Sequence, residues 1–147
     1  MRCNSQAVQD LIKKYRNMKI KGDIKLPKSV RIVEVGPRDG LQNEKNILDL
    51  EFKVDLIDRL SQTGLTYIES GSFVSPKWVP QMNSTKEVFQ NIHRHDDIVY
   101  SALVPNIKGL EGAKEVNCQE IAIFTAASET FVKKNINCSI VYIILKI

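Results

Sequence analysis

Residues 30–44, VRIVEVGPRDGLQNE, decide the fold because a β-branched run ends in a glycine turn that carries charge. The β-branched residues of 30–35 are typical of a strand. The turn contains the adjacent charges Arg38 and Asp39, and apolar residues at helical spacing follow at 50–63. The stretch therefore predicts the first β–α unit of an alternating fold.

The same unit recurs along the chain. Further strands are predicted at 66–69, 98–104 and 120–124, and helices from Ser84 through Ile92 and from Asn106 through Val116. Strands separated by helices of this length pair in parallel through right-handed crossovers. The sequence predicts an α/β fold, either an open sheet or part of a closed barrel. A (β/α)8 barrel needs eight units and usually about 250 residues, so four units make half a barrel.

Several residues are expected to bound or line these helices. Asp49 and Gly64 are placed to start and end the helix at 50–63, and Ser84 to Glu87 spells a capping box. Asn106 is expected to cap the next helix. The apolar face of the 50–63 helix is predicted to comprise Phe52, Leu56, Ile57 and Leu60.

Composition restricts the class of protein. The chain has 147 residues, 43% hydrophobic and 26% charged, which fits one compact domain. No run of roughly 18 apolar residues exists, which argues against a membrane span. Three widely spaced cysteines fit a reducing compartment. Residues 1–28 carry eight basic and two acidic side chains, and the remainder carries thirteen and fifteen, so no basic face for nucleic acid is expected on the body.

The two ends differ from the body, which suggests segments at 1–28, 29–139 and 140–147. Residues 6–20 read as a basic amphipathic helix, either a mitochondrial targeting segment or a solvated lead-in helix. Residues 140–147, IVYIILKI, could add a strand or, uncovered, promote aggregation. A chain that stops on such a run in mid-architecture looks truncated.

A candidate site lies at the carboxyl ends of the predicted strands. Arg38 and Asp39 follow the first strand, and Glu69 stands at the same end of the second. An ordinary surface ion pair is the simplest reading of Arg38 and Asp39, but Glu69 on the same rim favours a site. Two carboxylates beside an arginine could hold a hard divalent cation and an anionic substrate.

Three stretches resemble the hydroxymethylglutaryl-CoA lyase family. They are 35–45 (VGPRDGLQNEK), 72–82 (SFVSPKWVPQM), and 126–129 (AASE) continuing into 133–139 (KKNINCS). The resemblance covers residues 30–140 and implies a metal-dependent TIM barrel of which this chain is the amino-terminal half. It implies a carbon–carbon lyase that cleaves hydroxymethylglutaryl-CoA to acetyl-CoA and acetoacetate, in ketone-body formation and leucine catabolism.

The resemblance also implies roles for individual residues. Asp39 would bind the divalent cation, Mg or Mn, and Arg38 would stabilise the developing oxyanion as a catalytic and substrate-binding residue. Glu69 would support the same site as a second catalytic residue. Gln42 and Ser72 would bind substrate, an acyl-CoA. The compartment would be mitochondrial or cytoplasmic, with the family favouring mitochondria.

The departures from the family bear on activity. Its His-x-His metal pair, its later metal-binding Asn and its catalytic Cys loop are absent, and the match ends near Ile140. The resemblance therefore implies a fragment with little or no activity of its own. Two alternatives are a non-catalytic isoform that self-associates or binds the full-length enzyme, and an unstable product.

Two other motifs are expected to be structural. His93 and His95 spell His-x-His in or just after a helix, where residues two apart point in different directions, so metal binding is not expected. Cys118 and Cys138 have no evident activating neighbour. Cys118 is expected to pack before the fourth strand.

Overall fold

A computed structural model describes residues 27–136 and 138–141. The chain divides into Met1–Val30 and Arg31–Ile147, and every element described here lies in the second unit. The elements are η1, a π-helical turn (Gly36–Gly40), α2 (Leu50–Ser61), β1 (Tyr67–Ser72), η2, a 3-10 turn (Pro80–Met82), α3 (Thr85–Asn91), β2 (Val99–Leu103), α4 (Ile107–Glu115), β3 (Glu120–Ala122) and α5 (Glu129–Ile136).

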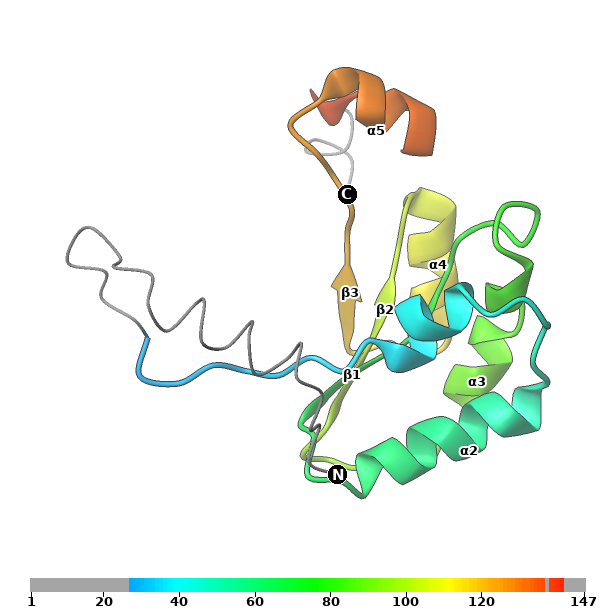
Figure 1. The fold of residues 1–147 in the computed structure, drawn as a ribbon, viewed down its shortest axis with the longest axis vertical. Coiled ribbons are helices and arrows are strands. Elements are labelled where there is room, and N and C mark those ends of the chain that lie inside the picture. The colour runs from blue at the N-terminus through cyan, green and yellow to red at the C-terminus, as the bar shows by residue number, and fades with distance from the viewer. Residues whose placement is uncertain (1–26, 137, 142–147) are drawn as a thin grey trace, which may run out of the picture. The chain divides into compact units, whose positions relative to one another are not determined.

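The three strands form one parallel sheet in the order β1-β2-β3. Ile68 pairs with Tyr100, and Ala102 pairs with Ile121. Helices α2, α3 and α4 lie on one side of the sheet (Figure 1). The predicted alternation of parallel strands and helices is therefore confirmed.

The first predicted strand, residues 30–35, is wrong as a strand. One residue of it, Glu34, bridges to Ile68 in parallel, through Glu34 N to Tyr67 O and Glu69 N to Glu34 O. The ladder ends there because the next carbonyl, that of Val35, instead accepts from the amides of η1. The segment thus lies beside β1 in the predicted position without forming a strand of its own.

The hydrophobic core lies between the sheet and its helices. Ile57 of α2, Ile68 of β1 and Tyr100 of β2 are fully buried, and Phe89 of α3 is 2% exposed. The predicted face of α2 needs one correction. Phe52 is 48% exposed, whereas Lys53, one residue on, is 5% exposed. Ile57 is buried and Leu60 packs against the core, as predicted, but the other buried residues of α2 are Lys53 and Ser61.

Two of the four predicted helix caps are confirmed and two are wrong. Helix α2 ends at Ser61 with Gln62 as its C-cap, so Gly64 lies beyond the helix end. Asp49 Oδ1 accepts from Phe52 N at 2.7 Å, and Asn106 Oδ1 accepts from Gly109 N at 2.9 Å. The capping box is not formed, because Ser84 makes no capping bond. Its hydroxyl instead accepts from Lys53 Nζ at 3.1 Å. Helix α3 nonetheless begins at Thr85, where the sequence pattern placed a helix start.

Strand β1 is irregular where it approaches the site. The register shifts between Glu69 and Gly71. A Cβ atom at Gly71 would lie 2.8 Å from the Thr85 side chain, which is closer than real Cβ contacts allow. A residue without a side chain is therefore required where β1 passes α3.

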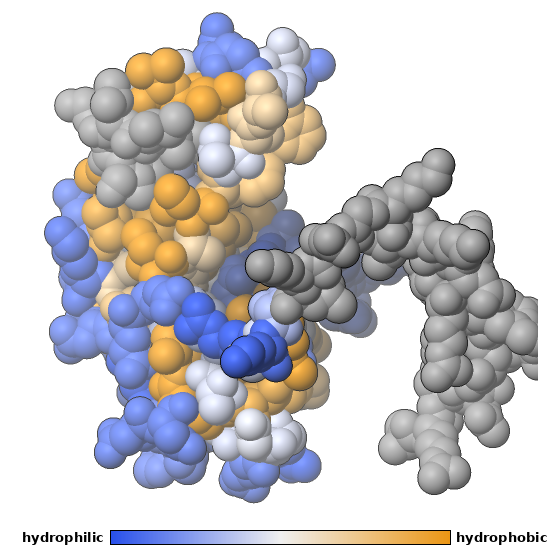
Figure 2. Space-filling model, turned by 90° about the vertical axis from the view of Figure 1, so that its left-hand side faces the viewer, coloured by the Kyte–Doolittle hydropathy of each residue, from blue (hydrophilic) through white to orange (hydrophobic). Residues whose placement is uncertain are grey.

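The side of the sheet away from α2, α3 and α4 carries apolar surface (Figure 2). Exposed large apolar side chains of this unit include Ile32, Val33, Val35, Ile123 and Phe124. Among the described residues, no helix is long and apolar enough to cross a membrane. The predicted helix at 6–20 and all of the 140–147 tail except its first two residues lie outside the described residues.

Candidate functional site

Arg38 lies between two carboxylates at the edge of the sheet. Its Nε donates to Glu69 Oε1 at 2.7 Å, and its Nη1 donates to Asp39 Oδ1 at 2.8 Å. The side chain is 18% exposed, so both bonds form in a partly desolvated setting. Charge-assisted hydrogen bonds of this kind fix the plane of a guanidinium group. Within the described residues, Arg38 Nη2 makes no hydrogen bond.

The backbone brings Arg38 and Glu69 together. The Val35 carbonyl accepts from the amides of Arg38 and Asp39 at 3.1 and 2.7 Å, which winds the chain into η1. The Glu69 amide donates to the Glu34 carbonyl at 2.8 Å. Segments 31 residues apart in sequence are thus tied both through the backbone and through the Arg38–Glu69 ion pair.

Asp39 is the most exposed member of this group. Its side chain is 56% exposed and its carbonyl accepts from Asn43 Nδ2 at 2.7 Å. Carboxylate oxygen is a ligand that Mg²⁺ and Mn²⁺ prefer, so the residue fits as one ligand of such a cation. No group of three or more His, Cys, Asp or Glu side chains comes together in the described part of the chain. In this part of the chain, Asp39 by itself offers at most one carboxylate to such a cation.

Within the described residues, Gln42 makes no hydrogen bond to these charges. It is exposed and lines a cavity of about 350 Å³ together with Lys45, Trp78 and Gln81. The cavity lies between the loop that follows η1 and the loop that follows β1. Trp78 is 84% exposed, an unusual setting for so large an apolar side chain.

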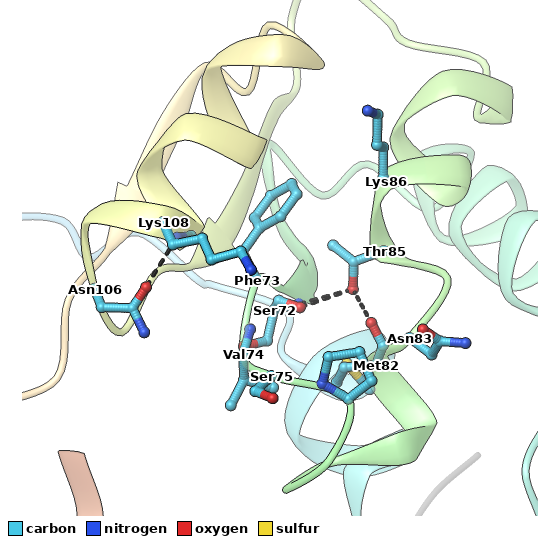
Figure 3. Close-up of a pocket in the computed structure, with 12 residues that line it drawn as sticks. Ser72, Phe73, Val74, Ser75, Met82, Asn83, Thr85, Lys86, Asn106 and Lys108 are labelled. Carbon is cyan, nitrogen blue, oxygen red and sulfur yellow. Dashed lines mark hydrogen bonds between the residues drawn. The ribbon is translucent and has the colours of Figure 1, made fainter. Parts of the chain in front are cut away.

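Ser72 lies at the end of β1 in a different pocket, of about 270 Å³ (Figure 3). Its hydroxyl donates to Leu103 O at 3.3 Å, and its amide donates to Thr85 Oγ1 at 3.2 Å. The Thr85 hydroxyl also lies 2.9 Å from the carbonyl oxygens of Ser72 and Met82. Within the described residues, neither Ser72 nor Gln42 bonds to the Arg38 group. The structure thus brings Arg38, Asp39 and Glu69 together and leaves the other two in separate pockets.

Sequence reasoning missed two buried polar residues near this rim. Gln81 is 4% exposed and Lys53 is 5% exposed. Lys53 Nζ donates to Gln81 O at 2.6 Å, and burial lowers the pKa of its ammonium group although the charge of Asp49 raises it. Gln81 lies inside the stretch 72–82 that resembles the lyase family, which was the available signal, but a glutamine beside prolines and a tryptophan carries no pattern of its own.

The structure describes both motifs that the sequence predicted to be structural, the histidine pair and Cys118. His93 and His95 follow the end of α3, and their rings lie 4.9 Å apart in edge-to-face contact, so the expectation that they would point apart is wrong. The chain leaves the helix at Ile92, and helical geometry no longer applies. Cys118 packs against the core before β3, as predicted, and burial raises the pKa of its thiol.

Comparisons with known proteins show which family residues 29–147 resemble. The HMGL-like family model matches residues 29–147. The 3-hydroxy-3-isohexenylglutaryl-CoA/hydroxy-methylglutaryl-CoA lyase of Pseudomonas aeruginosa is 59% identical over 115 residues, covering 78% of this chain and 38% of that protein. The mitochondrial hydroxymethylglutaryl-CoA lyase of Homo sapiens is 60% identical over 115 residues, covering 78% of this chain and 35% of that protein.

A solved structure is similar in fold. The HMG-CoA lyase from Acinetobacter baumannii, in complex with coenzyme A and 3-methylmalate, superposes with a TM-score of 0.73 at 43% identity. The match covers 76% of this chain and 36% of that one. The chain therefore spans little more than a third of the length of the relatives it matches.

Proposed function

Because the chain belongs to the HMGL-like family, we propose that it supplies the arginine–carboxylate part of an active site that cleaves hydroxymethylglutaryl-CoA to acetyl-CoA and acetoacetate. The observation that carries the proposal is the placement of Arg38 between Glu69 and Asp39 at the rim of a parallel sheet. The fold itself is an α/β fold of the TIM-barrel family, as predicted, and the described residues contain three strands where four were expected.

The reaction explains why such a group is useful. The tertiary hydroxyl of the substrate loses its proton, its oxygen forms the ketone of acetoacetate, and the neighbouring carbon–carbon bond breaks. The electron pair of that bond moves to the carbon beside the thioester, and protonation of the resulting enolate gives acetyl-CoA. Negative charge therefore moves between oxygens during the reaction, and fixed donors near them lower the barrier.

Each residue of the group receives one role in this proposal. Arg38 would donate its free N–H groups to the oxygen that becomes negative. Glu69 would hold the guanidinium in place through Nε, as a positioning residue. Asp39 would provide one ligand to a divalent cation. The family generally depends on such a cation, which supplies Lewis-acid polarisation of substrate oxygens.

Gln42 and Ser72 are proposed to contact the acyl-CoA substrate from the flanking pockets. The relative solved with coenzyme A supports an acyl-CoA as the ligand class. We propose a mitochondrial or cytoplasmic location, because the human relative is named mitochondrial and a relative from Rattus norvegicus is named cytoplasmic, and we favour mitochondria. Mg and Mn are both compatible with a carboxylate ligand.

The chain itself is expected to turn over little or no substrate. One proposed ligand does not complete the coordination shell of a cation, and one arginine does not complete the set of catalytic groups. Catalysis needs all reacting groups held together. An assay of the purified chain with substrate and Mg²⁺ or Mn²⁺ checks this expectation. Turnover above background would contradict it.

A chimera tests whether these residues are catalytically competent. Residues 29–139 would replace the matching stretch of the Pseudomonas aeruginosa relative, to which this chain is 59% identical over 115 residues. We expect the folded chimera to cleave hydroxymethylglutaryl-CoA, and R38M in the chimera to lower kcat by about 10²–10³. A chimera with native circular dichroism and no turnover, or one indifferent to R38M, would refute the proposed function.

Exposed apolar surface favours a second candidate, a non-catalytic chain that associates with itself or with a full-length lyase. Ile123 and Phe124 follow β3 and are 48% and 40% exposed, and β3 is an edge strand. Edge strands and apolar patches promote association. Light scattering after size exclusion, and co-purification with the human relative, test it. A monodisperse monomer that does not co-purify would exclude this candidate.

A further inference from the structure

We propose that Gln81, in η2, is a positioning residue that holds the loop following the Arg38–Asp39 turn against the end of the loop that follows β1. Its amide side chain makes two hydrogen bonds to one short stretch of backbone. Oε1 accepts from Leu48 N at 2.9 Å, and Nε2 donates to Asn46 O at 2.9 Å. A buried amide with both ends satisfied fixes a loop in one register, because slipping by one residue would break both bonds.

The bonded stretch needs such a support. Residues 41–44 are held by turn bonds from Asn43 N to Gly40 O and from Glu44 N to Leu41 O, and the start of α2 is held by the Asp49 cap. Between these, the described hydrogen bonds of residues 45–48 are those to Gln81. The side chain of Gln81 therefore fixes the middle of the segment that joins the Arg38 turn to α2.

Gln81 is itself fixed from the other side. Its carbonyl accepts from Lys53 Nζ at 2.6 Å, and the same ammonium group donates to Ser84 Oγ at 3.1 Å. Lys53 is 5% exposed and makes two hydrogen bonds. Displacing its side chain would break both bonds and leave their partners unsatisfied. Helix α2, turn η2 and the loop after η1 are thus joined at one point, and Gln81 belongs to the wall of the cavity that also contains Gln42.

The consequence for the proposed chemistry is geometric. Arg38 and Asp39 lie in η1, which leads into one loop, and Ser72 ends β1, which leads into the other loop, the one that carries Trp78. The relative position of the two loops determines whether one ligand can reach both. This inference rests on the proposed function, since positioning matters to the reaction only if Arg38 and Asp39 take part in it.

The test uses the hydrogen bond from Arg38 Nε to Glu69 as a reporter, in the 147-residue chain without ligand. Q81M preserves side-chain volume and removes both bonds to the loop. Nitrogen-15 NMR would follow hydrogen exchange at the Leu48 amide and at Arg38 Nε–H. We expect exchange at both sites to become about tenfold faster, as the loss of one to two hydrogen bonds implies.

Two controls separate positioning from general destabilisation. Q90M makes the same substitution at an exposed position of α3, and I98V removes one methylene from a core residue that is 2% exposed. Both should leave Arg38 Nε–H protected, I98V even with a lowered Tm. If Q81M does not fold, Q81N carries the test, because its side chain is too short to keep both bonds.

Each other outcome overturns the inference. Faster exchange at Leu48 with an unchanged Arg38 would show that Gln81 fixes its own contact and nothing beyond it. Unchanged exchange at both sites would show that the two bonds do not hold the loop. Equal acceleration of Arg38 in I98V would assign the effect to global stability. None of these readings depends on turnover, so failure of the lyase chimera would leave this result to stand separately.

Discussion

Different interactions stabilise the helix-covered side of the sheet and the rim formed by Arg38, Asp39 and Glu69 beside β1. Ile57, Phe89 and Tyr100 are at most 2% exposed and belong to one hydrophobic cluster. The rim is built around Arg38 and its two carboxylates, of which Asp39 is 56% exposed. Apolar packing contributes stability wherever it is buried, whereas each charge on the rim depends on its partner.

The contrast shows where the chain can change at low cost. The covered side tolerates changes of charge nearby but little loss of volume. The rim tolerates loss of volume but little loss of a partner. We expect substitutions on the two sides to separate along these lines.

Truncation of the core should have the largest effect on stability. F89A removes a ring that packs 6.1 Å from the Phe73 ring and is 2% exposed, and we expect the free energy of unfolding to fall by about 3–5 kcal/mol. F52A removes the same group from a position that is 48% exposed and should cost much less. Urea unfolding followed by circular dichroism measures both. Equal losses would mean that the helix-covered side is not the core.

Loss of the central arginine should have the next largest effect. R38M leaves Glu69, which is 9% exposed in its side chain, without its cation, and we expect a loss of about 1.5–3 kcal/mol. R59M breaks an exposed i,i+4 pair with Asp55 and should cost at most about 0.5 kcal/mol. Denaturant titration at low and high salt compares them. A loss for R38M as small as that for R59M would show that the rim is no more than a surface ion pair.

Sequence reasoning succeeded where local chemistry decides structure. Asp49 and Asn106 cap their helices because an acidic or amide side chain followed by a helical pattern has one favourable geometry. The parallel order of the strands followed from the lengths between them. Arg38 and Glu69 come together as expected, but not at two strand ends, because residues 30–35 form no strand and Glu69 is the third residue of β1, which continues to Ser72.

Sequence reasoning failed where a distant partner decides structure. Ser84 fits a capping box, but its hydroxyl accepts a hydrogen bond from Lys53 of α2 instead. No pattern in either segment predicts this contact. Phe52 was predicted to lie in the core because it is hydrophobic. The aliphatic part of Lys53 is buried instead, because its ammonium group donates a hydrogen bond to Gln81 O. Residues 30–35 have the composition of a strand, but the Val35 carbonyl accepts hydrogen bonds from the amides of η1 and not from a neighbouring strand.

The close approach of β1 and α3 should be sensitive to one methyl group. G71A would place a carbon 2.8 Å from the Thr85 side chain, and we expect a loss of about 1–3 kcal/mol. G40A adds the same group where no atom lies within 4 Å and should be neutral or slightly stabilising. Thermal unfolding compares the two variants. A neutral G71A would show that α3 can move away from the strand without cost.

The smallest expected effect is a dependence of stability on pH that comes from Cys118. Burial raises the pKa of its thiol above the ordinary 9.0, although the nearby charge of Arg94 lowers it. The folded chain therefore holds this proton more tightly than the unfolded chain. Stability from this source is complete below pH 9.0 and is lost as pH rises through the folded pKa.

Replacing the thiol isolates this contribution from those of the other titrating groups. C118S keeps a small buried side chain that does not ionise in this range, whereas Lys53 and Tyr67 titrate alike in both chains. We expect the difference in unfolding free energy between wild type and C118S to shift in favour of C118S between about pH 8 and about pH 10. Urea titrations at the two pH values measure that difference. A constant difference would mean that the thiol is as well solvated in the folded chain as in the unfolded one, and that the packing of β3 against the core is looser than the structure shows.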